Sequence, residues 1–180
     1  MNPRESLLSA ARFAFWIFLV LTLAFVVFIV WSHGRLPDRI PVHFDFEGEV
    51  NRRASKSEFL VVNLGVAALL FVCFGMFALF VGRIPNRYFN LPHRDYWLAP
   101  ERRSQSIARF NAWYLWMGIL SLGLMFHLAW QVYEIGMGKT ERLESGWIAL
   151  TVYLSGLTLL CLGLWRAFAK KPTEDYSGHR

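Results

Sequence analysis

Long apolar stretches alternate with short polar segments along this chain. The first two stretches contain no charged residue and no histidine, the third contains three strongly polar residues, and the fourth carries no charge. Each is long enough to cross about 30 Å of hydrocarbon as a helix. The pattern predicts four membrane-spanning helices, over about residues 12–32, 59–82, 110–133 and 146–167. No cleavage-site pattern follows the first stretch, so we expect it to remain as an anchor.

This order predicts an all-α integral membrane protein with a single domain over residues 1–180. The simplest arrangement is a four-transmembrane-helix up-down bundle, with a short extended or hairpin segment in the first outer loop. Composition agrees, because 55% of the residues are hydrophobic and only 18% are charged. A water-soluble domain is normally less apolar than this.

The basic residues indicate how the chain crosses the membrane. Twelve Lys and Arg lie in the two termini and loop 83–109, against seven in loops 33–58 and 134–145. The positive-inside rule therefore predicts cytoplasmic termini, an inner loop 83–109 and outer loops 33–58 and 134–145. The net charge of +6 arises from basic residues that flank the membrane spans and set the topology. It therefore does not indicate nucleic-acid binding, and we expect no nucleic-acid partner.

Polar and apolar residues alternate in the first outer loop, over Ile40 to Glu47. In an extended segment Val42, Phe44 and Phe46 share one face, and His43, Asp45 and Glu47 share the other. Gly48 is suited to the turn that follows, and Glu49 to Lys56 return toward the second span. The pattern predicts a strand or a hairpin.

One face of this segment offers weak candidate metal ligands, His43, Asp45 and Glu47. An imidazole and two carboxylates suit zinc or manganese, although any half-exposed strand presents alternate polar residues to water. The favoured interpretation is a hydrogen-bonded loop cap, without a cofactor. No nucleophile, nucleotide-loop or metalloprotease motif is present, so we expect no catalytic residue and no enzyme.

Three polar residues are expected at membrane depth: Asn63, His127 and Gln131. His127 and Gln131 are four residues apart and share a helical face, and Asn63 is predicted at a similar depth. Because unpaired polar groups are costly in a bilayer, we expect a hydrogen-bond network between helices. A proton or ligand site is the alternative.

The inner loop mixes arginine with aromatic residues, which suits the lipid headgroup layer. Membrane lipids are therefore expected partners, and a short interfacial helix is expected near residues 100–109. The candidate headgroup residues are Arg87, Arg94, Trp97, Arg102 and Arg103.

The first outer loop also carries a motif with fixed spacing, which consists of Leu36, Pro37, Ile40, Pro41, His43, Phe44, Gly48 and Lys56. It resembles the signature of a family of bacterial membrane proteins, the domains of unknown function numbered 1648. The same domain forms the N-terminal part of immunity proteins against the sporulation-delaying toxin. The resemblance implies a bacterial inner-membrane protein, and it assigns no catalytic role to the motif.

These observations favour a non-enzymatic multi-pass inner-membrane protein whose outer loop binds a peptide or protein partner or organises the bundle. One alternative is an immunity or envelope-stress factor that binds a toxic peptide. Another is a metal-dependent membrane enzyme that uses the imidazole and carboxylates of the first loop.

Overall fold

Four long helices make up most of the computed structural model, which describes residues 3–170. They are α1 (Pro3–His33), an interrupted second helix over Lys56–Arg83, α5 (Arg103–Gly136) and α6 (Gly146–Ala169). All four are long and apolar enough to span a membrane, which confirms the predicted number of spans. The basic residues Lys171 and Arg180, which entered the predicted orientation, lie outside the described residues.

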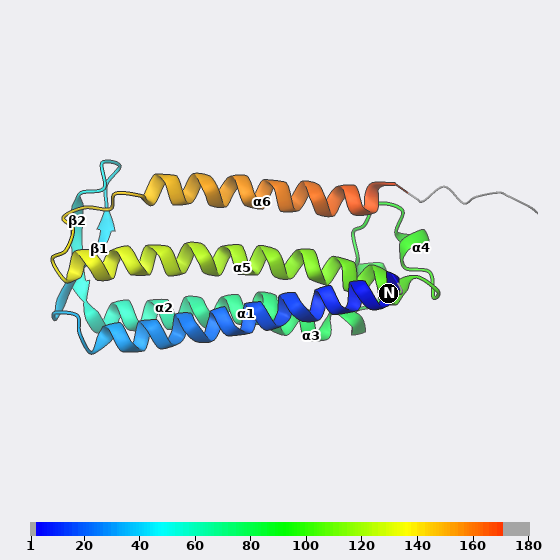
Figure 1. Cartoon of the computed structure of the whole chain (residues 1–180), viewed down its shortest axis with the longest axis horizontal. Coiled ribbons are helices and arrows are strands. Elements are labelled where there is room, and N and C mark those ends of the chain that lie inside the picture. Colours follow the sequence, from blue (N-terminus) through cyan, green and yellow to red (C-terminus); the bar gives the residue numbers. More distant parts are fainter. Residues whose placement is uncertain (1–2, 171–180) are drawn as a thin grey trace, which may run out of the picture.

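Helix α5 occupies the centre of the arrangement, with α1 and α2 on one side and α6 on the other (Figure 1). Phe18, Phe25 and Ile29 of α1 are fully buried, and they share one hydrophobic core with Leu115 and Leu122 of α5. In contrast, α6 packs chiefly against α5, and Phe168 is its only buried residue. The ends of α1 and α5 lie beside the starts of α2 and α6 (Figure 1).

The second helix changes its winding along its length. It comprises α2 (Lys56–Leu70), the π-helical η1 (Phe71–Met76), α3 (Phe77–Phe80) and the 3-10 turn η2 (Val81–Arg83). A π-helical turn alters the regular backbone hydrogen bonds. Here the Tyr114 hydroxyl of α5 donates to the Cys73 carbonyl at 3.1 Å, and the Asn111 side chain donates to the Ala78 carbonyl at 3.2 Å. Side chains of α5 therefore support the irregular stretch.

The segment between the second and third spans differs from the prediction. Residues 103–109 are not a separate interfacial helix, because they form the first two turns of α5. The separate short elements are η3 (Asn86–Tyr88) and α4 (Arg94–Trp97). Polar residues such as Ser104 and Gln105 continue the helical hydrogen bonds beyond the apolar stretch. Hydrophobicity marks the part of a helix that suits the bilayer, and not its first residue.

The first loop forms the predicted hairpin. Strand β1 (Arg39–Phe44) pairs antiparallel with β2 (Val50–Ser55), and irregularities on both sides of His43 interrupt the register. The alternation ends earlier than predicted, because Asp45 begins the turn, and Gly48 adopts a φ of 82° there.

Candidate functional site

The hairpin and its flanking residues, 36–56, are called the hairpin cap below, because they lie across one end of α5 (Figure 1). Leu36 and Ile40 are buried against Gly136, near the end of α5. A Cβ atom at Gly136 would lie 2.7 Å from Leu36 Cδ2 and 3.3 Å from Ile40 Cγ2. The glycine therefore leaves room for the two apolar side chains of the motif.

The turn of the cap contacts the loop that precedes α6. The Leu143 amide donates to the Gly48 carbonyl at 2.9 Å, and a Cβ atom at Gly48 would lie 2.6 Å from the Leu143 carbonyl oxygen. Beside this contact, Trp147 Nε1 donates to the Phe46 carbonyl at 2.9 Å. The Phe46 and Trp147 rings stack with an interplanar angle of 4°. The cap thus joins the α1–α2 side of the protein to α6.

Lys56 closes the base of the cap. Its amide donates to the Asp38 carbonyl at 3.1 Å, and its ammonium group lies 3.0 Å from Asp38 Oδ1 and 3.4 Å from the Leu36 carbonyl. Of the remaining motif residues, Pro41 is buried, Phe44 is half-buried and Pro37 is exposed. Leu36, Ile40 and Gly48 therefore seat the cap on its neighbours, and Lys56 ties the cap to itself.

The three candidate metal ligands do not converge. His43 Nδ1 donates to Asn51 Oδ1 across the hairpin at 2.6 Å. Asp45 Oδ1 accepts hydrogen bonds from the amides of Glu47 and Glu49, at 3.1 and 2.8 Å. Within residues 3–170, no group of three or more His, Cys, Asp or Glu side chains is placed to hold a metal ion. The strand ends before Asp45, so the alternation that would align the three side chains is lost.

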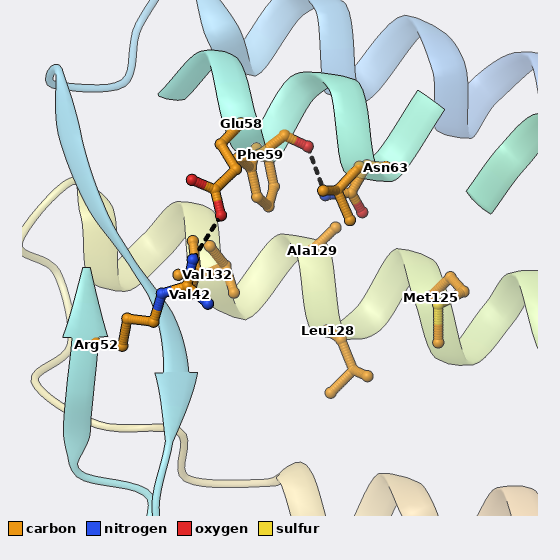
Figure 2. Close-up of a pocket in the computed structure, with 10 residues that line it drawn as sticks. Val42, Arg52, Glu58, Phe59, Asn63, Met125, Leu128, Ala129 and Val132 are labelled. Atoms are coloured by element: carbon orange, nitrogen blue, oxygen red, sulfur yellow. Dashed lines mark hydrogen bonds and ion pairs between the residues drawn. The ribbon is translucent and has the colours of Figure 1, made fainter. Parts of the chain in front are cut away.

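A pocket of about 330 Å³ lies between the hairpin, α2 and α5 (Figure 2). Arg52 of β2 and Glu58 of α2 form an ion pair at its edge, with Nη2 and Oε1 2.8 Å apart. Phe59 and Asn63 point from α2 toward α5 (Figure 2). The remaining lining residues are apolar: Val42, Val62, Met125, Leu128, Ala129 and Val132. The pocket therefore combines an apolar wall with two opposite charges.

The predicted intramembrane network forms with a different partner. The Gln131 amide donates to His127 Nε2 at 2.7 Å, and the Ser145 hydroxyl lies 3.0 Å from the same nitrogen. The Ser145 amide donates to Gln131 Oε1 at 3.3 Å. Asn63 instead donates to the Phe59 carbonyl of its own helix at 2.9 Å. The expected pairing of Asn63 with His127 and Gln131 is therefore wrong, and the network joins α5 to the start of α6.

Two candidate headgroup residues have internal partners instead. Trp97 is buried, and its Nε1 donates to the Phe168 carbonyl at the end of α6 at 2.8 Å. Arg103 donates to Asn86 Oδ1 and to the carbonyls of Gly82 and Ile84, over 2.8 to 3.0 Å. Both side chains hold elements together, and neither is directed freely toward lipid.

Of the other three headgroup candidates, Arg102 is half-buried and Arg87 and Arg94 are exposed. Arg102 stacks on Tyr96, with 4.1 Å from its guanidinium carbon to the ring centre, and donates to the Tyr96 carbonyl at 3.1 Å. Arg87 lies over the Tyr88 ring, and Arg94 pairs with Asp95 at 3.4 Å. Arg87 and Arg94 are exposed, so both remain available to phosphate groups.

Sequence reasoning missed Arg52, Glu58, Ser145 and Trp147. Ser145 directly precedes the fourth apolar stretch, and a serine there signals a helix N-cap. That signal locates the helix start and does not reveal that the hydroxyl contacts a histidine of another helix. The pairing of Arg52 with Glu58 depends on how the hairpin folds back on α2.

These features define a multi-pass protein of four apolar helices whose end is closed by a hairpin cap. Residues 17–66 match the family model described as a domain of unknown function (DUF1648). The matched segment contains just over half of α1, the whole hairpin cap and the first part of α2, and over these residues it confirms the resemblance that the loop motif indicated. No curated protein and no solved structure matches the chain.

Proposed function

We propose that this is a non-catalytic membrane protein in which the hairpin cap closes one end of an up-down bundle and presents its tip to a peptide or protein partner. The proposal rests on the contacts that four motif residues make. Leu36, Ile40, Gly48 and Lys56 seat the cap on α5, on the loop before α6 and on its own base. These residues hold the cap in place, and the cap in turn fixes the position of its exposed tip.

The tip supplies the surface. The Phe46 side chain is 79% exposed although its ring stacks on Trp147, which is itself 55% exposed. Glu47 and Glu49 are exposed beside it. Exposed aromatic rings are enriched at binding surfaces, and the two carboxylates add negative charge. A partner with apolar and basic side chains complements this tip.

Photocrosslinking in cells tests the proposed partner. A photoreactive amino acid at position 46 is expected to give an adduct of one reproducible mass. The same amino acid at position 88 is the control, because Tyr88 is 67% exposed and lies in the loop that leads to α4, at the end of the bundle opposite the strands (Figure 1). Identical adduct patterns from the two positions, or no adduct from position 46, would refute binding at the tip.

The proposal places the protein in the inner membrane of a bacterium, with cytoplasmic termini and the cap outside. The distribution of basic residues supports this orientation, and the resemblance to the family supports the bacterial membrane. Cysteines at the exposed positions 47 and 101 test it, after alanine replaces the exposed Cys73 and Cys161. A membrane-impermeant maleimide is expected to label position 47 in intact cells. Labelling of position 101 alone would show that the orientation is the reverse of the proposed one.

A second candidate is an immunity or envelope-stress factor that captures a toxic peptide. The hairpin has only two strands, and Asn51, Arg52 and Arg53 of β2 are exposed. An extended peptide can add to such a free strand edge. Cells that lack the gene are then expected to be more sensitive to an extracellular toxic peptide, and the intact gene to restore resistance. Equal sensitivity to a panel of such peptides would count against this function.

A further inference from the structure

We propose that the pocket between the hairpin, α2 and α5 binds one phospholipid with a phosphoethanolamine headgroup. An acyl chain would lie along the apolar wall, and the headgroup would lie against Arg52 and Glu58 at the edge (Figure 2). This site is separate from the tip at Phe46, so it does not depend on the proposed partner.

The position of the pocket along the helices suits a lipid. Glu58 lies in the first turn of α2, where the membrane-spanning helix begins. Val62 is one turn further along, which is about 6 Å deeper. Its side chain is 55% exposed on a helix with the composition of a membrane span. The pocket therefore runs from headgroup level into the hydrocarbon layer, where acyl chains are the surrounding molecules.

The ion pair leaves bonding capacity for a headgroup. Arg52 Nη2 contacts Glu58 Oε1, and within residues 3–170 the structure gives neither side chain another hydrogen bond. Their side chains are 63% and 46% exposed. The other guanidinium N–H groups are free to donate to a phosphate, and Glu58 Oε2 is free to accept from an ammonium group. A zwitterionic headgroup can therefore join the pair without separating it.

The same charges select among headgroups. Phosphoethanolamine carries both a phosphate and an ammonium group with N–H donors, so it complements both side chains. Phosphocholine has no N–H donor for Glu58, and phosphoglycerol offers no positive charge. Hydrogen bonds that involve charged groups are the stronger class. We therefore expect phosphatidylethanolamine to bind about tenfold more tightly than phosphatidylcholine, which corresponds to one such bond.

Native mass spectrometry of the full chain in detergent, titrated with each dioleoyl phospholipid, measures this preference. Glu58→Gln is expected to remove it, because the two headgroups differ in the N–H donors that face Glu58 and share the phosphate. Arg52→Gln is expected to weaken binding of both lipids, and Val62→Trp is expected to block the pocket and weaken both about tenfold. Arg53→Gln and Val61→Trp are matched controls, because both residues are exposed and neither lines the pocket. Circular dichroism establishes that each variant keeps its helices.

Two results with the phospholipids themselves would overturn the proposal. One is equal affinity for the ethanolamine and choline lipids. The other is that Val62→Trp binds phospholipid as tightly as Val61→Trp. This comparison tests the pocket even if Arg52→Gln does not fold. Glycerophosphoethanolamine, which lacks acyl chains, is expected not to compete. Competition by this soluble headgroup at equal concentration would contradict a lipid site.

Discussion

Arg103 shows how one polar side chain completes an irregular helix end. The second helix finishes in a 3-10 turn, so its last carbonyls lack regular helical partners. The guanidinium group donates to the carbonyls of Gly82 and Ile84 and also binds Asn86. Sequence pattern alone assigns such an arginine to the headgroups, because it cannot show which carbonyls the fold brings within reach.

Replacing Arg103 with glutamine is expected to destabilise the protein by about 2 kcal/mol, because hydrogen bonds from a charged donor are lost. Arg94→Gln is the control, since Arg94 is exposed and pairs with its exposed neighbour Asp95, and it is expected to change stability by less than about 0.5 kcal/mol. Unfolding by SDS in mixed micelles measures both. Equal losses in the two variants would contradict the structural role of Arg103.

At the scale of elements, α6 is joined to its neighbours by polar contacts near both of its ends. Ser145, which precedes it, contacts His127 and Gln131 of α5, and the Phe168 carbonyl at the other end accepts from Trp97. Between these ends, Leu120 and Trp113 of α5 pack closely on Gly156 and Gly163 of α6. The polar contacts and this packing together set where α6 lies against α5.

A double-mutant cycle tests the polar contact at the start of α6. His127→Ala and Ser145→Ala are expected to show a coupling energy of about 1 kcal/mol, as for hydrogen bonds between helices in membranes. His127→Ala and Asn63→Ala are expected to be additive within about 0.5 kcal/mol, because the Asn63 side chain donates to the Phe59 carbonyl of its own helix. Coupling of His127 to Asn63 rather than to Ser145 would contradict the network seen here.

At the scale of the whole molecule, the four spans and the hairpin could be predicted from sequence, because both follow from local periodicity. Apolar stretches identify spans wherever they occur, and the alternation before Gly48 identifies an extended segment. The π-helical Phe71–Met76 segment and the early start of α5 could not be predicted, because hydropathy does not record helical winding or the end of a helix.

Most of the candidate site also depended on the tertiary fold. The predicted polar network did not include Ser145, because the contact between Ser145 and His127 joins two different helices. Likewise, the three candidate metal ligands do not converge, because the Asp45 carboxylate accepts hydrogen bonds from two backbone amides of the turn. The grouping of the motif residues stays a prediction, and the structure places Leu36, Ile40 and Gly48 of that group at the contacts that seat the cap.

The central claim is that the motif seats the hairpin cap on the rest of the bundle, and Gly48 tests it most directly. Gly48 and Gly138 both have positive φ, of 82° and 72°, but only at Gly48 would a Cβ atom meet another backbone segment. Alanine at either position incurs the strain of a left-handed conformation, about 1 kcal/mol. Gly48→Ala must also displace the Leu143 carbonyl, at a further cost of about 2 kcal/mol.

The decisive measurement is therefore the free energy of unfolding of Gly48→Ala and Gly138→Ala in mixed micelles. We expect losses of about 3 and about 1 kcal/mol, so that the cap contact accounts for the difference. Equal losses in the two variants would show that the turn of the hairpin does not rest on the loop before α6, and would contradict the account.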